Sequence, residues 1–274
     1  LPPWLKVQLP TGPTFERIKD VSARRGLATV CEQARCPNIA ECWGGGTATL
    51  MLMGDLCTRG CRFCNVKSGR PKEGVIDADE PRKVAEAVRL MELDYVVLTS
   101  VDRDDLPDQG SAHLAETIRR VLAESPKTLV EILIPDFRGQ TELLAPIVEA
   151  GPQVIAHNLE TVRRLTPSVR DARATYEQSL AVLRGLKALK PDLVTKSSLM
   201  LGLGETREEI LQAMEDLRAA GVEVLTLGQY LRPSGWHLAV ERFATPEEFE
   251  NLKAEGEARG FLYVASGPLV RSSY

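Results

Sequence analysis

From Thr47 onward, the chain alternates short runs rich in β-branched residues with longer amphipathic runs. This alternation is typical of parallel βα units, in which each strand returns to the sheet through a helix. It predicts strands at about 48–53, 94–99, 128–134, 153–157, 194–201 and 224–230, and helices at about 80–93, 111–124, 141–150, 175–189, 207–220 and 246–259. Six βα units are too few to close an eight-stranded barrel. We therefore expect an α/β fold with an open, six-stranded (β/α)6 partial TIM barrel.

Three helix starts carry chemical signals. Ser111 is predicted to be an N-cap, and Thr206 with Glu209 matches a capping box. Thr245 precedes a proline and two glutamates, which favours a helix that begins at Pro246.

The composition narrows the class of protein. Of the 274 residues, 43% are hydrophobic and 26% are charged, and no apolar run approaches the roughly 20 residues of a membrane span. A net charge of -4 gives no case for nucleic-acid binding. Without a secretory leader, the six cysteines are expected to be reduced thiols in the cytoplasm, where clustered cysteines bind metal.

One loop holds three of these cysteines, in the sequence Cys57-Thr58-Arg59-Gly60-Cys61-Arg62-Phe63-Cys64. The loop follows the first predicted strand directly, which places it at the catalytic edge of such a sheet. A zinc site would need a fourth ligand, and the three histidines are distant in sequence. A four-iron cluster held by three cysteines leaves one iron open to a small chelating molecule. Zinc or inert thiols remain the alternatives.

A second cysteine triplet, Cys31, Cys36 and Cys42, has a different spacing. Pro37 and the glycines at 44–46 predict an irregular loop around it, which suits a cluster better than a packed core. Three buried free thiols are the alternative.

The spacing C-x3-C-x2-C, with Phe63 before the last cysteine, resembles the signature of radical S-adenosylmethionine (SAM) enzymes. The wider pattern resembles the lipoyl synthase family. The stretches that carry this resemblance are the double triplet, 99–106, 157–161, 202–205, 229–234 and Arg271-Ser272-Ser273-Tyr274. Two positions depart from the family pattern, since Asp102 stands where Asn is usual and Ser198 where Gly is usual.

The resemblance implies a radical SAM sulfurtransferase with two [4Fe-4S] clusters. The cluster at Cys57, Cys61 and Cys64 would generate radicals from SAM. The second cluster, at Cys31, Cys36 and Cys42 and called the auxiliary cluster below, would donate sulfur to C6 and C8 of an octanoyl-lysine. The implied partners are octanoylated carrier domains, either the 2-oxoacid dehydrogenase E2 or the glycine cleavage H protein, and an electron donor such as flavodoxin or ferredoxin. A biotin-synthase-like enzyme and a two-cluster electron carrier without SAM chemistry are the alternatives.

Six residues match positions that contact SAM in this family: Phe63, Thr99, Ser100, Asn158, Glu160 and Arg173. Thr99 and Ser100 could accept from the amino group, and Arg173 could pair with the carboxylate. Asn158 and Glu160 could hold the ribose, and Phe63 could cover the adenine. Four of the six have a structural alternative: a surface ion pair for Arg173, a strand-end turn for Asn158, a solvated carboxylate for Glu160, and core packing for Phe63.

The terminal motif completes the expected organisation. The resemblance places one of its serines on the auxiliary cluster, and we choose Ser273 over Ser272. The expected divisions are an extension at 1–46 that binds the auxiliary cluster, a radical SAM barrel at 47–260, and a segment at 261–274 that returns to the auxiliary cluster.

Charge is distributed unevenly along the chain. Residues 1–74 carry a net charge of +5, and the remaining residues carry -9. Basic residues in the first quarter could attract an acidic carrier surface. The arginines considered are Arg24, Arg25, Arg35, Arg59 and Arg62. A scattered set of solvated charges is the alternative.

Overall fold

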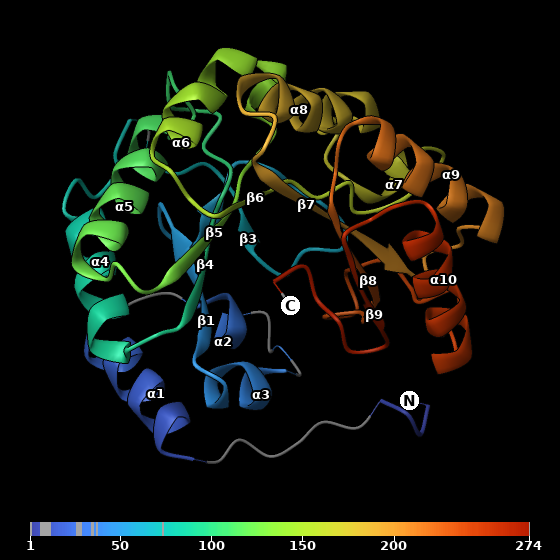
Figure 1. Cartoon of the computed structure of the whole chain (residues 1–274), viewed down its shortest axis with the longest axis horizontal. Coiled ribbons are helices and arrows are strands. Elements are labelled where there is room, and N and C mark those ends of the chain that lie inside the picture. Colours follow the sequence, from blue (N-terminus) through green and yellow to red (C-terminus); the bar gives the residue numbers. More distant parts are fainter. Residues whose placement is uncertain are drawn as a thin grey trace. The chain divides into compact units, whose positions relative to one another are not determined.

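The computed structural model of the chain is shown in Figure 1. It describes residues 2–5, 12–25, 29–33, 36, 38–72 and 74–273. The chain separates into two compact units, which we describe one at a time. The N-terminal unit comprises Val7–Arg59 and Asn65–Ile155, and the C-terminal unit comprises Leu1–Lys6, Gly60–Cys64 and Ala156–Tyr274.

Strands and helices alternate in the N-terminal unit after a helical start. Its helices are α1 (Pro13–Arg25), α2 (Val30–Gln33), α3 (Ile39–Gly44), α4 (Glu80–Met91), α5 (Ser111–Glu124), the 3-10 turns η1 (Phe137–Gly139) and η2 (Thr141–Leu144), and α6 (Ala145–Glu149). Its strands are β1 (Thr47–Leu52), the short pair β2 (Leu56–Cys57) and β3 (Lys67–Ser68), β4 (Tyr95–Ser100), β5 (Leu129–Leu133) and the start of β6 (Val154–Ala156).

The parallel register of this unit aligns the ends of its strands. Leu52 of β1 pairs with Ser100 of β4, and Leu98 of β4 pairs with Ile132 of β5. The loops after β1, β4 and β5 therefore start from the same edge of the sheet. Cys57 was predicted to follow the first strand directly; it lies instead in the short strand β2, which begins at Leu56 after β1 has ended at Leu52.

The segment with the second triplet differs from the sequence prediction. Instead of an irregular loop, it contains the short helices α2 and α3. Trp43 of α3 is 1% exposed, and its ring centroid lies 5.2 Å from that of Phe15 in α1. Burial of two aromatic rings supplies a stabilisation that the local sequence, rich in Cys and Gly, does not reveal.

The C-terminal unit continues the βα alternation. It contains α7 (Thr166–Val169), α8 (Tyr176–Leu189), β7 (Val194–Leu201), α9 (Arg207–Ala219), β8 (Val224–Gln229), α10 (Pro246–Ala258) and β9 (Tyr263–Gly267). β7, β8 and β9 are parallel neighbours. One apolar core lies between these strands and their helices, and it includes Leu180, Leu183, Leu217, Leu225, Leu227 and Phe249.

The main sheet has the strand order β1-β4-β5-β6-β7-β8-β9. The α/β class is confirmed, but the predicted number of six strands is too low. The additional strand is β9, within the segment that the sequence analysis treated as a tail. Val264 and Ala265 are buried in β9, and pairing with β8 holds a run whose last three residues, Ala, Ser and Gly, are weak strand formers.

Two of the three predicted helix caps are confirmed. Thr206 with Glu209 and Thr245 with Glu248 form complete capping boxes. Ser111 is not an N-cap, because Gly110 occupies that position, and the Asp108 carboxylate accepts from the N–H groups of Gly110 and Ala112. Among the described residues, no helix combines the length and apolar character needed to cross a membrane.

Candidate functional site

The thiol of Cys57 sits at the aligned strand edge of the N-terminal unit. Its sulfur accepts the backbone N–H groups of Arg59 and Asp102, each at 3.4 Å. Asp102 also brings its Oδ2 atom to 3.6 Å from the same sulfur. The two N–H donors favour a thiolate, which is the form that binds iron, whereas the Asp102 carboxylate accepts from the thiol and favours the protonated form.

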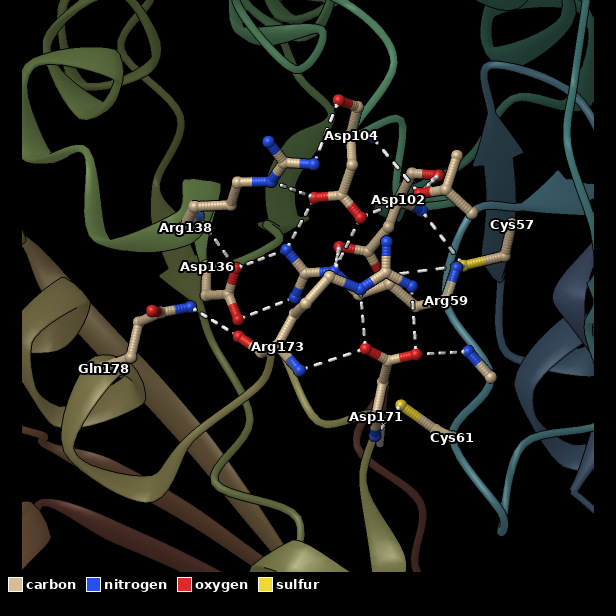
Figure 2. Close-up of polar contacts among 12 residues, drawn as sticks. Cys57, Arg59, Cys61, Asp102, Asp104, Asp136, Arg138, Asp171, Arg173 and Gln178 are labelled. Atoms are coloured by element: carbon tan, nitrogen blue, oxygen red, sulfur yellow. Dashed lines mark hydrogen bonds and ion pairs between the residues drawn. The ribbon is translucent and has the colours of Figure 1, made fainter.

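Arg59, two residues after Cys57, is only 4% exposed. Its guanidinium binds Asp136 through two contacts of 2.7 Å and Asp104 through contacts of 3.0 and 2.9 Å. Asp102 lies 3.4 Å from the Nε atom. Figure 2 shows these carboxylates around Arg59. The fork of one arginine thus ties the cysteine loop to the loops after β4 and β5.

The carboxylates around Arg59 differ in their electrostatics. Burial favours protonation of Asp104, but its hydrogen bonds with Arg59 and the charge of Arg59 hold its pKa at about 2. Burial raises the pKa of Asp102 to about 6; the charge of Arg59 opposes this shift, and those of Asp136 and Asp104 add to it. Burial would lower the pKa of Arg59, yet its hydrogen bonds with Asp104 and Asp136 raise it. Arg59 therefore stays charged.

Cys61 and Cys64 belong to the C-terminal unit, where α7 and the residues after it hold their segment. The Asp171 N–H donates to Cys61 Sγ at 3.3 Å, and Figure 2 shows both residues. The Asp171 carboxylate accepts the Gly60 N–H at 2.9 Å. The Arg62 N–H donates to Val169 O at 2.9 Å. The backbone around Cys61 is therefore fixed from both sides.

Burial raises the pKa of the Cys61 thiol to about 11; the Asp171 N–H and the charge of Arg170 oppose the shift, and Cys64 and Glu160 add to it. A bound cation would reverse this balance, because a metal-ligating thiol is deprotonated.

The second triplet gathers in the N-terminal unit. The Cys36 N–H donates to Cys31 O at 2.9 Å, and the Cys42 N–H donates to Asn38 O at 2.9 Å. Burial raises the pKa of Cys42 to about 12, and the charges of Cys36 and Cys31 raise it further. Cys31 lies in α2, Cys42 lies in α3 and Cys36 lies between them, and the charges of Cys31 and Cys36 both reach the Cys42 sulfur.

These donor sets fit iron–sulfur clusters. Soft thiolates are the usual ligands of such clusters, and both triplets contain partly buried sulfurs whose thiolate charges a bound cluster would offset. Among the described residues, no three His, Cys, Asp or Glu side chains converge as ligands of one metal ion. Cluster ligands bind separate irons at separate corners, so they need not converge in this way.

The SAM residues predicted in the N-terminal unit lie at the end of β4. Thr99 and Ser100 are half-buried, and the Ser100 hydroxyl is a buried polar atom with no hydrogen-bond partner among the described residues. An unsatisfied buried hydroxyl costs about 1–3 kcal/mol. A polar ligand at this strand end would remove that cost.

Asn158 and Glu160 follow β6 in the C-terminal unit. The Asn158 amide donates to Glu160 Oε1 at 3.1 Å, and Glu160 adopts a left-handed φ of 69°, which is strained for a non-glycine residue. Burial raises the pKa of Glu160, while the charge of Arg170 and the Asn158 hydrogen bond lower it. Strain at a strand end is typical of a binding site.

Arg170 is a residue that the sequence analysis missed. It is 8% exposed, and its charge acts on both Glu160 and Cys61. One end of its guanidinium donates to Ser179 Oγ at 2.7 Å. Its Nε–H has no acceptor among the described residues. A buried guanidinium with a spare donor suits a carboxylate ligand.

Arg173 forms an ion pair and Phe63 packs in an apolar cluster, which are the roles without SAM that the sequence also allowed. Arg173 is 42% exposed and forms an ion pair with Asp171 at 2.8 Å, which Figure 2 shows. Phe63 is half-buried and packs near Val169, Leu203 and Tyr230. Contacts of either residue with SAM remain predictions.

The terminal segment packs on β8. A Cβ atom at Gly228 would lie 2.0 Å from Val270 O, so this close approach requires glycine. The Arg271 guanidinium donates to Gln229 O at 3.5 Å. Ser273 is half-exposed, its role on the auxiliary cluster remains a prediction, and Tyr274 lies outside the described residues.

The structure corrects one residue of the predicted charge surface. Arg59 is buried and satisfied by carboxylates, so it does not attract a partner. Arg24 is exposed and paired with Asp20 at 2.8 Å, and Arg62 is exposed. Arg35 lies outside the described residues, as does the side chain of Arg25.

Comparisons with known proteins agree with this arrangement. A model of the radical SAM superfamily matches residues 51–217, and a model of the N-terminal domain of lipoyl synthase matches residues 1–36. The chain is 61% identical to the lipoyl synthase of Myxococcus xanthus, covering all of this chain and 91% of that protein. It is 58% identical to the lipoyl synthase of Thermus thermophilus, covering all of this chain and 84% of that protein. A crystal structure of HydG, a maturase of the [FeFe]-hydrogenase, shares the fold with a TM-score of 0.60 at 13% identity, over 92% of this chain and 67% of that one.

A parallel α/β sheet with a C-x3-C-x2-C loop after its first strand defines a radical SAM enzyme. Within that superfamily, the chain belongs to the lipoyl synthase family, as its identity to curated members over its whole length shows.

Proposed function

We propose that this chain inserts two sulfur atoms into an octanoyl chain that is amide-linked to a lysine of a carrier protein, at C6 and C8. Each insertion replaces one C–H hydrogen with sulfur, the hydrogen leaves on 5′-deoxyadenosine, and one SAM is consumed. The second triplet carries this proposal. The reduced thiols of Cys31, Cys36 and Cys42, which lie in a separate segment from the first triplet, would supply a second cluster site, which radical generation alone does not require.

The two cysteine triplets indicate which residues would bind the two clusters. Cys57, Cys61 and Cys64 would bind the radical SAM cluster, and Cys31, Cys36 and Cys42 with Ser273 would bind the auxiliary cluster. Together with SAM, the clusters supply one-electron cleavage of a C–S bond and a source of sulfide. Arg59 would hold the Cys57 loop in place, and the Asp171 N–H would stabilise the Cys61 thiolate.

The polar residues would orient SAM. Thr99 and the unsatisfied Ser100 hydroxyl would bind its amino group, and Asn158 with Glu160 would hold the ribose. A guanidinium would bind the carboxylate, either Arg173, as the family pattern implies, or Arg170, which is buried with a spare donor. Phe63 would cover the adenine from the neighbouring apolar cluster.

The proposed partners follow from this reaction. They are octanoylated carrier domains, namely the 2-oxoacid dehydrogenase E2 or the glycine cleavage H protein, and a small electron donor such as flavodoxin or ferredoxin. We place the reaction in the cytoplasm, where these partners and reduced thiols occur.

Separating the triplets tests the proposal. Replacing Cys31, Cys36 and Cys42 with Ala should leave reductive SAM cleavage intact and abolish sulfur insertion, because radical formation needs only the other cluster. The same change at Cys57, Cys61 and Cys64 is the matched control and should abolish both activities. Anaerobic analysis should find about eight irons in the wild type and about four in either variant. Lipoyl product from the first variant would refute the sulfur-donor assignment.

A further inference from the structure

The turn at 232–236 exposes a large apolar ring. All five of its residues are exposed, and Trp236 is 96% exposed, whereas the other exposed large hydrophobic side chains of the described residues range from 37% to 75%. Tryptophan gains much stabilisation when its ring is buried, and it is enriched among residues that anchor protein interfaces. An almost fully exposed indole on a folded turn therefore suggests a partner.

The turn is held in place by its own hydrogen bonds. The Arg232 Nε–H donates to His237 O at 2.9 Å, and the guanidinium also donates to Gly235 O. The His237 N–H donates to Ser234 O at 3.2 Å, and the Trp236 N–H donates to Ser234 Oγ at 3.4 Å. Little conformational entropy is left to lose when a partner binds such a turn.

His237 joins this turn to the cysteine loop within the C-terminal unit. Its Nε2 atom lies 3.0 Å from Cys64 O. A carbonyl only accepts, so Nε2 carries the hydrogen. In the neutral ring, Nδ1 then accepts from the Ser234 hydroxyl at 2.8 Å. A second link runs from the Leu238 N–H to Arg62 O at 3.2 Å. Trp236 is thus displayed on a turn built directly onto the segment that carries Cys61 and Cys64.

The charges on this turn indicate the kind of partner. Residues 231–240 contain one arginine, one histidine and no acidic residue. Arg232 is exposed, and so is Arg62, whose backbone pairs with Leu238. The Arg232 guanidinium lies on the same turn as the indole, where it donates to His237 O and Gly235 O, and the Arg62 guanidinium donates to Ser168 O. An exposed apolar ring on a turn with arginine and no carboxylate complements an acidic surface with an apolar patch.

We propose that Trp236, with Arg62 and Arg232, forms the docking surface for the folded carrier domain that presents the acyl-lysine. This inference rests on the proposed function, which requires a protein-bound substrate to reach the cysteine loop. The indole packs against the carrier, and the two arginines face its acidic residues. A carrier bound at this turn lies close to the segment of Cys64, because His237, next to Trp236, contacts Cys64 O.

A comparison of two substrates tests the docking surface. Trp236→Ala should raise the KM for octanoylated H protein about tenfold, equivalent to ~1.4 kcal/mol, without a comparable change in the KM for an octanoyl-lysine peptide. Trp236→Phe should restore most of the loss, because it returns an aromatic ring. Leu262→Ala is the matched control, since Leu262 is also exposed and apolar, at 75%, and it should change neither KM. An equal change with both substrates, or none with either, would overturn the proposal.

Calorimetric titration with octanoylated H protein adds a readout that does not depend on turnover. Affinity should fall about tenfold in Trp236→Ala and should weaken with added salt in the wild type, because the arginine contacts are screened. Unchanged affinity in the variant would refute docking at this turn. Failure of the proposed function would look different: the wild type would then make no lipoyl product from either substrate.

Discussion

Arg59 shows how much a single side chain in the cysteine loop can organise. Its buried guanidinium lies within 3.4 Å of three carboxylates from two other loops, and one of these, Asp104, also pairs with the exposed Arg138. Removing one partner from a buried ion pair is far more costly than removing one from an exposed pair. The position of Cys57, whose sulfur accepts the Arg59 N–H, depends on the same loop.

Replacement of Arg59 should therefore be severe. We expect Arg59→Met to lower the free energy of unfolding by about 3–5 kcal/mol and to reduce iron incorporation at the first triplet. Urea unfolding of the cluster-free protein and anaerobic iron analysis would measure the two effects. Arg138→Met is the control, because Arg138 pairs with the same Asp104 at 3.0 Å but is 49% exposed; it should cost less than about 1 kcal/mol. Similar losses in both variants would show that burial of Arg59 is not the cause.

Arg170 and Arg173 offer a matched pair for locating the SAM carboxylate. Arg170 is buried with an unused Nε–H, whereas Arg173 is exposed and already bound to Asp171. A buried charge-assisted hydrogen bond contributes about 1.5–3 kcal/mol. Arg170→Met should then weaken SAM binding by at least about tenfold, and Arg173→Met by much less.

Equilibrium binding of SAM to cluster-loaded protein would measure both variants. Thermal unfolding would check that neither change disrupts the fold, since Arg170 also donates to Ser179. A larger loss in Arg173→Met would return the carboxylate role to the residue that the family pattern implies.

At the scale of elements, the contact between β8 and the terminal segment requires a glycine at position 228. Gly228 lies so close to Val270 that any Cβ would collide with its carbonyl oxygen. β9 leads into this contact, and the Val270 N–H donates to Gly267 O at 3.1 Å. The path of the last residues is therefore set by the surface of β8 rather than by their own sequence.

Gly228→Ala should displace the terminal segment. We expect faster hydrogen exchange at residues 268–273 and much less lipoyl product, with reductive SAM cleavage retained, because only the auxiliary cluster would lose its proposed serine ligand. Gly267→Ala is the control, since its Cβ would lie 3.4 Å from the Val270 side chain, an ordinary contact. If Gly228→Ala displaced the segment without affecting sulfur insertion, the terminal motif would have no part in that step.

At the scale of the whole molecule, the sequence predicted what local patterns encode. β7 was predicted with its observed bounds, Val194–Leu201, because its run is long and flanked by strong helices. Arg59 was interpreted as a surface charge, because its partners Asp104 and Asp136 lie 45 and 77 residues away. Such contacts arise only once the parallel register aligns the strand ends, and no local pattern records them. α3 was missed for the same reason, since its burial depends on Phe15.

The final prediction concerns Ser273, which the family pattern assigns to the fourth corner of the auxiliary cluster. A serine oxygen is a harder donor than a thiolate and a poorer match for a soft iron–sulfur site. Ser273 would therefore hold the cluster less firmly than a cysteine would, and a weakly held cluster would be the better source of sulfide. Ser273→Cys should therefore assemble both clusters, with about eight irons, and yet make much less lipoyl product.

Ser272→Cys is the matched control, because adjacent residues point in different directions, and it should behave like the wild type. Parallel Mössbauer spectra and product assays would decide between them. Full activity in a fully loaded Ser273→Cys protein would show that a labile ligand at this position is not part of the reaction.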